Sequence, residues 1–331
     1  MSEQQEFSQQ ELESVDNEFE LIPPAPEGLR SGFVGIIGRP NVGKSTLMNQ
    51  LVGQKIAITS PIAQTTRNRL RGILTTDNSQ IIFVDTPGIH KPHHQLGEVL
   101  VRNAQVAISS VDLLLFVVDG SVEVGGGDRY IAELLARAEA PIILGINKAD
   151  QQLSASPDEV REAEHPLDRG YRELAENQGW AIAKFSALTG DGIETLQAKL
   201  EQSLEPGPYY YPPDLVTDQP ERFIMGELIR EQILQLTREE VPHSVAITID
   251  QVVEEPTITR VLATVNVERP SQKGIVIGKG GEMLKAIGSA ARQQIQKLIA
   301  GKVYLELFVK VQPKWRQSRT RLAELGYRLE E

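Results

Sequence analysis

Eight consecutive residues near the start of the chain have the types and spacing needed to hold phosphates. Residues 38–45 read GRPNVGKS and match the pattern G-x-x-x-x-G-K-[S/T]. In this pattern the glycines let backbone N–H groups turn toward phosphate oxygens, the lysine reaches the β- and γ-phosphates, and the hydroxyl binds Mg²⁺. The sequence therefore predicts a nucleotide-phosphate site formed by Gly38, Asn41, Val42, Gly43, Lys44, Ser45 and Thr46.

An acidic motif after a second apolar run can complete this site. Asp85 ends the run QIIFVD and is followed by Thr86, Pro87 and Gly88. A carboxylate at the end of a strand beside a phosphate loop can hold the water shell of Mg²⁺. The Gly88 N–H can reach a γ-phosphate, so we expect its position to depend on whether that phosphate is present.

The motif NKAD, residues 147–150, indicates which base the nucleotide carries. It resembles the N-K-x-D motif of GTPases, in which the carboxylate at the position of Asp150 accepts hydrogen bonds from guanine N1–H and the 2-amino group. Adenine lacks these donors and would leave the carboxylate unpaired, which favours GTP and GDP over ATP. The segment SAL resembles the further guanine-contacting loop, in which the Ala187 N–H would meet guanine O6. The predicted base contacts are Asn147, Lys148, Asp150, Ser186, Ala187 and Leu188.

A polar segment between the first two motifs, AQTTRNRL at residues 63–70, resembles the first switch of the TrmE–Era–Der group of GTPases. The resemblance implies that Thr66 binds Mg²⁺ in the GTP state, with Thr65 as the alternative. The expected metal ligands are then Ser45, Thr66 and Asp85. The expected catalytic groups are Lys44, Thr66, Gly88 and Asn41.

Ile89 stands where Ras-like GTPases place the glutamine that orients the attacking water. Isoleucine cannot form that hydrogen bond, so we expect hydrolysis to be slow or to be helped from elsewhere. In some related GTPases an asparagine at the position of Asn41 helps to hold a K⁺ ion, and Arg67 acting as an arginine finger is the alternative. Three histidines follow within residues 90–94, where a mobile second switch loop is favoured over a metal site.

A second candidate site lies near the end of the chain. Residues 277–281 read IGKGG and fit the I-G-x-x-G turn of KH domains, whose backbone clamps single-stranded RNA between two helices. Glycines let phosphates approach the main chain without meeting a Cβ atom. Basic residues would contact phosphates, and Trp315 would offer a stacking surface. The predicted RNA contacts are Lys273, Ile277, Gly278, Lys279, Gly280, Gly281, Lys285, Arg292 and Trp315.

The charge distribution supports this second site although the chain of 331 residues has a net charge of −11. Residues 1–30 hold eight acidic residues and one basic residue, whereas residues 268–321 hold twelve basic and three acidic residues. An acidic tail therefore masks a basic module in the overall sum. The chain has no cysteine, which excludes disulfides and thiolate metal sites, and it has no apolar run long enough to span a bilayer.

The elements that must position these residues form two domains. Between residues 30 and 204, apolar strands at 33–37, 80–85, 111–119, 141–147 and 181–187 alternate with helices. This pattern predicts an α/β, doubly wound, mostly parallel sheet of the P-loop GTPase class, with an extra edge strand near residues 70–75. A proline-rich linker follows at 205–220, and the order α-β-β-α-α-β at 221–331 predicts an α+β type II KH domain. Residues 1–29 are expected to be a disordered acidic tail.

Taken together, GRPNVGKS, AQTTRNRL, DTPGIHKP, NKAD, SAL and GIVIGKGG resemble the bacterial Era family of GTPases over residues 32–315. The resemblance implies a factor that matures the small (30S) ribosomal subunit. Its KH domain would bind 16S ribosomal RNA near the 3′ end, and GTP would set the affinity. It also implies a cytoplasmic monomer with a peripheral fraction at the inner membrane.

Two other functions remain open at this point. A signalling GTPase could use its C-terminal domain to bind a protein or an anionic membrane, and the salt dependence of RNA binding would separate this alternative from the first. An ATP-driven enzyme is the third reading, against which NKAD argues.

Overall fold

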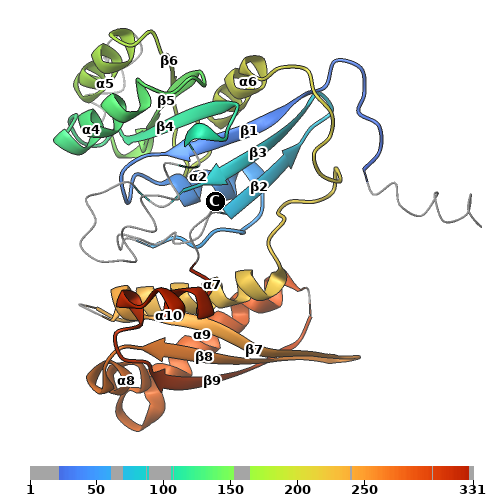
Figure 1. Ribbon diagram of the computed structural model, residues 1–331, viewed down its shortest axis with the longest axis vertical. Coiled ribbons are helices and arrows are strands. Elements are labelled where there is room, and N and C mark those ends of the chain that lie inside the picture. Colours follow the sequence, from blue (N-terminus) through green and yellow to red (C-terminus); the bar gives the residue numbers. More distant parts are fainter. Residues whose placement is uncertain are drawn as a thin grey trace, which may run out of the picture.

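The computed structural model describes residues 22–60, 70–86, 88, 106, 108–152, 165–238, 241–299 and 301–327. Within this part the chain forms a six-stranded sheet and a three-stranded sheet, which with their helices we call the first and second units; Figure 1 shows them one above the other. No described helix combines the length and the apolar character needed to cross a lipid bilayer.

The sheet of the first unit has the strand order β2-β3-β1-β4-β5-β6. Its strands are β1 (Arg30–Ile37), β2 (Leu70–Thr75), β3 (Ser79–Asp85), β4 (Leu113–Asp119), β5 (Ile142–Asn147) and β6 (Ala181–Lys184). Only β2 runs antiparallel to its neighbour, so the mostly parallel sheet and its edge strand are confirmed. β6 ends before the predicted residue 187, because the Ser186 N–H turns away to donate to the Asp191 carbonyl at 2.8 Å.

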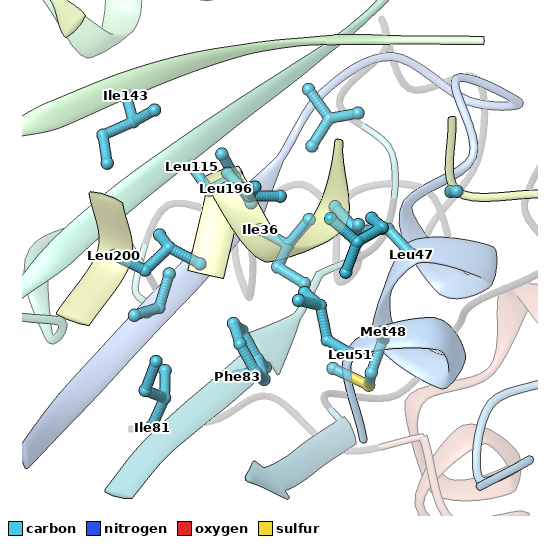
Figure 2. Packing of buried hydrophobic residues seen from close by; sticks show 14 of the residues in the cluster. Ile36, Leu47, Met48, Leu51, Ile81, Phe83, Leu115, Ile143, Leu196 and Leu200 are labelled. Carbon is cyan, nitrogen blue, oxygen red and sulfur yellow. The ribbon is translucent and has the colours of Figure 1, made fainter. Parts of the chain in front are cut away.

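Helices cover both faces of this sheet, which explains why its strands are continuous apolar runs. The helices α2 (Lys44–Val52) and α6 (Ile193–Ser203) share one core, and α4 (Gly126–Leu135) and α5 (Pro166–Glu176) share the other. Figure 2 shows the first core, where Met48 of α2 and Leu196 of α6 pack with Phe83 of β3. β3 and β4 lie on opposite sides of β1, so the loop after β1 opens at a topological switch point, where such sheets bind ligands.

The second unit has the predicted order α-β-β-α-α-β. Its main elements are α7 (Glu221–Leu236), β7 (Ala246–Glu255), β8 (Ile258–Val267), α8 (Pro270–Ile277), α9 (Glu282–Leu298) and β9 (Val303–Val311). The described part of this unit also contains the 3₁₀ turns η2 (Pro242–Ser244), η3 (Lys279–Gly281) and η4 (Trp315–Gln317) and the short helix α10 (Arg319–Glu324). β7 is antiparallel and β9 parallel to the central β8, and α7 and α9 bury one face of the sheet.

The linker between the units is bound to the first unit along its β2–β3 edge. The Gln80 Oε1 accepts hydrogen bonds from the N–H groups of Tyr210 and Tyr211, at 2.7 and 3.0 Å. Arg71 of β2 forms an ion pair of 2.5 Å with Asp218. The linker is therefore anchored at several points rather than being a free tether.

The chain enters and leaves the first unit at one place. Arg30 forms an isolated antiparallel bridge with Pro206, and the Gly207 N–H donates to the Leu29 carbonyl at 2.9 Å. Leu29 is only 2% exposed, so the prediction of disorder through residue 29 is wrong at its end. The sequence did not reveal this burial, because a single leucine after an acidic tail gives no periodic apolar pattern. Residues 1–21 of the tail lie outside the described part of the chain.

Candidate functional site

The phosphate loop after β1 needs its glycines for packing as well as for ligand approach. A Cβ atom on Gly38 would lie 2.3 Å from the Val117 carbonyl oxygen, and one on Gly43 would lie 2.3 Å from Asn147 Nδ2. Gly43 also has a φ of 97°, a conformation that favours glycine. The loop is thus pressed against the ends of β4 and β5, and its N–H groups begin α2, where a helix dipole favours anions.

Lys44 lies buried in the loop, and within the described part of the chain its ammonium group bonds to main-chain carbonyls. Its Nζ donates to the carbonyls of Gly38 and Arg39, at 3.2 and 2.9 Å. Burial lowers the pKa of Lys44 to about 8, and the charge of Asp85 only partly opposes this effect. A phosphate placed here would return the electrostatic stabilisation that burial removes from the ammonium group.

Two of the three predicted Mg²⁺ ligands, Ser45 and Asp85, belong to the described part of the chain, and their side chains are in contact. Ser45 Oγ donates to Asp85 Oδ2 at 2.8 Å, at the carboxyl end of β3. Hydroxyl and carboxylate oxygens are the hard donors that Mg²⁺ prefers, so the pair fits this ion. Gly88 is close as well, because a Cβ atom on it would lie 2.7 Å from the Pro40 nitrogen. A pocket beside this pair is lined by Pro40, Asn41, Gly43, Lys44, Ser45, Thr46, Ile58, Thr59, Ser60 and Gly88.

Asn147 connects three loops at the base side of this pocket. Its Nδ2 donates to the Val42 carbonyl at 2.8 Å, and its Oδ1 accepts from the Ala187 N–H at 2.9 Å. The Ser186 hydroxyl donates to Asp150, which is exposed. The Ala187 N–H donates to Asn147 in this structure, and its contact with guanine O6 stays a prediction.

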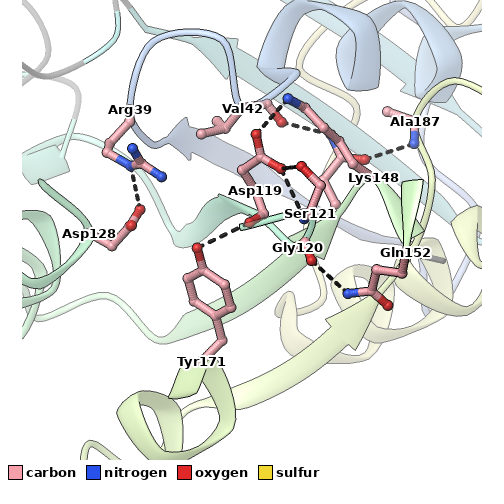
Figure 3. A network of polar contacts seen from close by, with 11 residues as sticks. Arg39, Val42, Asp119, Gly120, Ser121, Asp128, Lys148, Gln152, Tyr171 and Ala187 are labelled. Carbon is pink, nitrogen blue, oxygen red and sulfur yellow. Dashed lines mark hydrogen bonds and ion pairs between the residues drawn. The ribbon is translucent and has the colours of Figure 1, made fainter. Parts of the chain in front are cut away.

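Asp119 is a site residue that the sequence analysis did not single out. Its Oδ2 lies 2.6 Å from Lys148 Nζ, and its Oδ1 accepts from the Ser121 N–H at 3.0 Å (Figure 3). Burial raises the pKa of Asp119, but the hydrogen bonds and charge of Lys148, together with Ser121, lower it below its usual value. Lys148 itself has a φ of 65°, so the ion pair holds an unusual backbone turn. An acid at the end of a buried strand, as at Asp85, was the available signal.

Arg39, inside the phosphate loop, is held away from the pocket by a buried acid. Its Nε lies 2.7 Å from Asp128 Oδ1 of α4, as Figure 3 shows, and Asp128 also accepts from the Gly125 N–H at 3.0 Å. Tyr171 of α5 completes this support by donating to the Asp119 carbonyl at 3.1 Å. The loop is therefore braced by α4, a contact between distant segments that no local motif reveals.

Several predicted switch residues lie outside the described part of the chain. They are Thr65, Thr66, Arg67, Ile89 and the histidines of residues 90–94. Among the described residues, no group of three or more His, Cys, Asp or Glu side chains could hold a metal ion.

The glycines of the second site divide into two kinds. A Cβ atom on Gly278 would lie 2.7 Å from Met283 Cβ, so this glycine is needed to join α8 to α9. Gly280 and Gly281 have φ values of 63° and 85°, and a Cβ atom on either would meet open space. Their missing side chains therefore leave the turn accessible to a ligand, whereas Gly278 serves the fold. Lys279 lies exposed between them.

A groove continues from this turn between α9 and the edge strand β9. It is lined by Gly281, Leu284, Lys285, Gly288, Ser289, Arg292 and the strand residues 303–307. The helix residues among these recur every three or four positions, so they form one stripe on α9. The small residues Gly288 and Ser289 keep the groove open, and the exposed cations Lys285 and Arg292 stand beside it. The stripe is a signal that the sequence analysis used only for the two cations.

Three of the predicted RNA contacts have other surroundings. Trp315 is fully buried, and its Nε1 donates to the Ser244 carbonyl at 3.1 Å, so the prediction that its ring stacks on bases is wrong. The Trp315 ring stacks on the Tyr327 ring, with 5.7 Å between the ring centroids. Its apolar surface is therefore buried although its sequence neighbours are basic. Ile277 packs against the core of the second unit, and Lys273 Nζ lies 5.5 Å from the centre of the Phe308 ring.

Two family models match the two units. A model described as a 50S ribosome-binding GTPase matches residues 33–148, and a KH-domain model matches residues 240–316. The GTPase Era of Nostoc sp. (strain PCC 7120 / SAG 25.82 / UTEX 2576) is 74% identical over 310 residues, covering 94% of this chain and 93% of its own length.

Two solved structures resemble the whole arrangement. Aquifex aeolicus Era Y63A bound to GDP·AlF4⁻ has a TM-score of 0.85 and 36% identity, covering 91% of this chain and 100% of its own. A structure of Era in complex with MgGDPNP and nucleotides 1506–1542 of 16S ribosomal RNA has a TM-score of 0.84 and 35% identity, with the same coverage.

Proposed function

The chain belongs to the Era family of GTPases, and from that premise we propose that it is a GTP-hydrolysing switch that binds 16S ribosomal RNA near its 3′ end. In this role it assists maturation of the small (30S) ribosomal subunit. One observation carries the proposal: a single chain joins the Ser45–Asp85 phosphate pocket to an open glycine turn and basic groove. A relative of the same fold binds that RNA together with MgGDPNP.

The nucleotide would lie across the carboxyl ends of the first unit's strands. The N–H groups of residues 41–46 and the Lys44 ammonium would bind its phosphates, and Ser45 and Asp85 would hold Mg²⁺, with Thr66 added in the GTP state. The ion supplies positive charge to the β- and γ-phosphate oxygens. Asp150 would accept from guanine N1–H and the 2-amino group, while Asn147 and Lys148 would brace the loop and the lysine stem would cover the base. Water then attacks the γ-phosphate, giving GDP and phosphate.

The RNA would lie in the groove between α9 and β9. The exposed turn at Lys279, Gly280 and Gly281 would clamp its backbone, and Lys285 and Arg292 would contact phosphates. The KH domain corresponds to residues 221–331, the GTPase domain to residues 30–204 and the linker to residues 205–220. We also propose a cytoplasmic monomer with a peripheral inner-membrane fraction, as the family resemblance implies.

The experiment that tests this function measures binding of a single-stranded RNA matching the 3′ end of 16S ribosomal RNA, with a GTP analogue and with GDP. Tight binding that weakens steeply with salt is expected, because several phosphate contacts release counterions. Binding that changes with neither salt nor nucleotide would instead favour a signalling GTPase whose second unit binds protein or membrane.

Exchange of K⁺ for Na⁺ is expected to slow GTP hydrolysis about tenfold, which corresponds to about 1.4 kcal/mol of transition-state stabilisation. Asn41 lines the phosphate pocket with a φ of 64°, and it is the residue proposed to help hold the cation. Steady-state phosphate release in matched KCl and NaCl buffers measures the effect. Asn41→Ala should abolish the difference, and equal rates of the unaltered protein in both salts would contradict the K⁺ proposal.

A further inference from the structure

A short segment of the first unit lines the phosphate pocket and at the same time packs into the second unit. Ile58, Thr59 and Ser60 form one wall of the pocket that contains Lys44 and Ser45. Yet Ile58, which is 4% exposed, belongs to the hydrophobic core built by α7, α9 and the three-stranded sheet. Any movement of this wall must therefore be accommodated by the second unit.

One carboxylate of the second unit binds this segment directly. Glu231 lies in the middle of α7, and its side chain is 1% exposed. Its Oε2 accepts from Lys55 Nζ at 2.6 Å, and its Oε1 accepts from the Thr59 N–H at 2.8 Å and, more weakly, from the Thr59 hydroxyl at 3.4 Å. The carboxylate thus holds both ends of the segment 55–59.

The linker offers a different connection between the units. Its bonds reach Arg71 and Gln80 at the β2–β3 edge, and none of its residues lines the phosphate pocket as the structure describes it. The Arg71–Asp218 ion pair is half-exposed on the arginine side, much as the Lys55–Glu231 pair is on the lysine side. The two pairs therefore form a matched comparison of two routes.

We propose that Glu231 is a positioning residue through which the RNA-binding unit sets the wall of the nucleotide site. Loss of these partners would leave an uncompensated charge buried in the protein interior, which is strongly unfavourable. Displacement of Thr59 by a change of nucleotide must therefore move α7 with it or break this contact. Because coupling between two binding sites is reciprocal, RNA bound to the second unit must then change the affinity for nucleotide by the same factor by which nucleotide changes the affinity for RNA.

The proposal rests on the function proposed above, and its test uses the full chain. Affinity for the 16S 3′-end RNA is measured with a GTP analogue and with GDP, and affinity for each nucleotide is measured with and without RNA. Coupling of about tenfold is expected for the unaltered protein, within the usual range for linked sites. In Glu231→Gln it should fall below about twofold, because an amide cannot pair with both Lys55 and Thr59 as the carboxylate does.

Two further variants separate positioning from simple loss of structure. Lys55→Met removes the contact from the other unit and should also lower the coupling, whereas Glu231→Asp should restore part of it. Asp218→Asn breaks the ion pair of the linker and should leave the coupling unchanged. Thermal melting of each variant checks that it folds.

The outcomes are distinct. Coupling retained in folded Glu231→Gln and Lys55→Met, or lost only in Asp218→Asn, would overturn the proposal and assign the route to the linker. An unaltered protein that binds RNA and hydrolyses GTP without any coupling would also overturn it, while leaving both activities in place. An unaltered protein that binds no RNA would mark failure of the proposed function itself.

Discussion

Asp150→Asn is expected to weaken GTP binding about 1,000-fold and to improve binding of xanthosine triphosphate. The carboxylate is proposed to accept two hydrogen bonds from guanine, and sites built around such contacts reject a mismatched partner strongly. In the variant, the amide oxygen can keep the hydrogen bond that Ser186 donates to Asp150 Oδ1. The amide nitrogen then faces the base, where it repels the guanine amino group and can donate to the 2-oxo group of xanthine.

Equilibrium binding of GTP, xanthosine triphosphate and ATP measures this change of specificity. Asp191→Asn is the matched control, because Asp191 lies in the neighbouring loop and accepts hydrogen bonds from residues of that loop, from the Ser186 N–H to its carbonyl and from the Thr189 hydroxyl to its side chain at 2.7 Å. If Asp150→Asn bound GTP as tightly as the unaltered protein, Asp150 could not be the group that reads the base.

Gly280→Asp is expected to lower RNA affinity about 100-fold while leaving GTP hydrolysis without RNA unchanged. The new carboxylate would stand in the open space where an RNA phosphate is expected, so it adds both bulk and repulsion. The φ of 63° also strains a side chain, and this part of the effect must be separated from the charge.

Gly280→Asn provides that separation, since asparagine tolerates the left-handed conformation about as well as aspartate and carries no charge. RNA affinity for the two variants is measured by titration at two salt concentrations. Asp should be the weaker binder, and the difference between the variants should shrink at high salt. Equal losses in both variants at both salt concentrations would assign the effect to the backbone and not to a phosphate contact.

The relative placement of the phosphate loop, Asp85 and NKAD could be predicted because each of these motifs is local and lies at the end of a strand. In a parallel sheet those strand ends share one edge, so Ser45 and Asp85, distant in sequence, had to meet, as their 2.8 Å contact confirms. The supports of the site could not be predicted in this way. Arg39 pairs with Asp128 through helix packing that leaves no pattern in either segment. Lys148 pairs with Asp119, for which the sequence signal was an acid at the end of a buried strand.

Trp315 shows the opposite error, in which a residue of the hydrophobic core was predicted to contact a ligand. Its basic neighbours suggested an exposed aromatic residue, but a tryptophan also buries a large apolar surface when its N–H finds a partner. The Ser244 carbonyl, far away in sequence, supplies that partner. Composition alone cannot distinguish the two environments, because both require a tryptophan beside cations. The hydrogen bond that the Thr59 N–H donates to Glu231 could not be predicted either, since the sequence of α7 is that of an ordinary buried helix.

The bridge between Arg30 and Pro206 has a consequence for how such a chain can be built and altered. Both ends of the first unit meet at one hydrogen-bonded point, so the chain enters and leaves the unit there without passing through its core. A domain whose ends meet at the surface tolerates insertion into other chains and circular permutation. The nucleotide-binding unit can therefore be fused to a different partner domain during evolution without changes to its hydrophobic core.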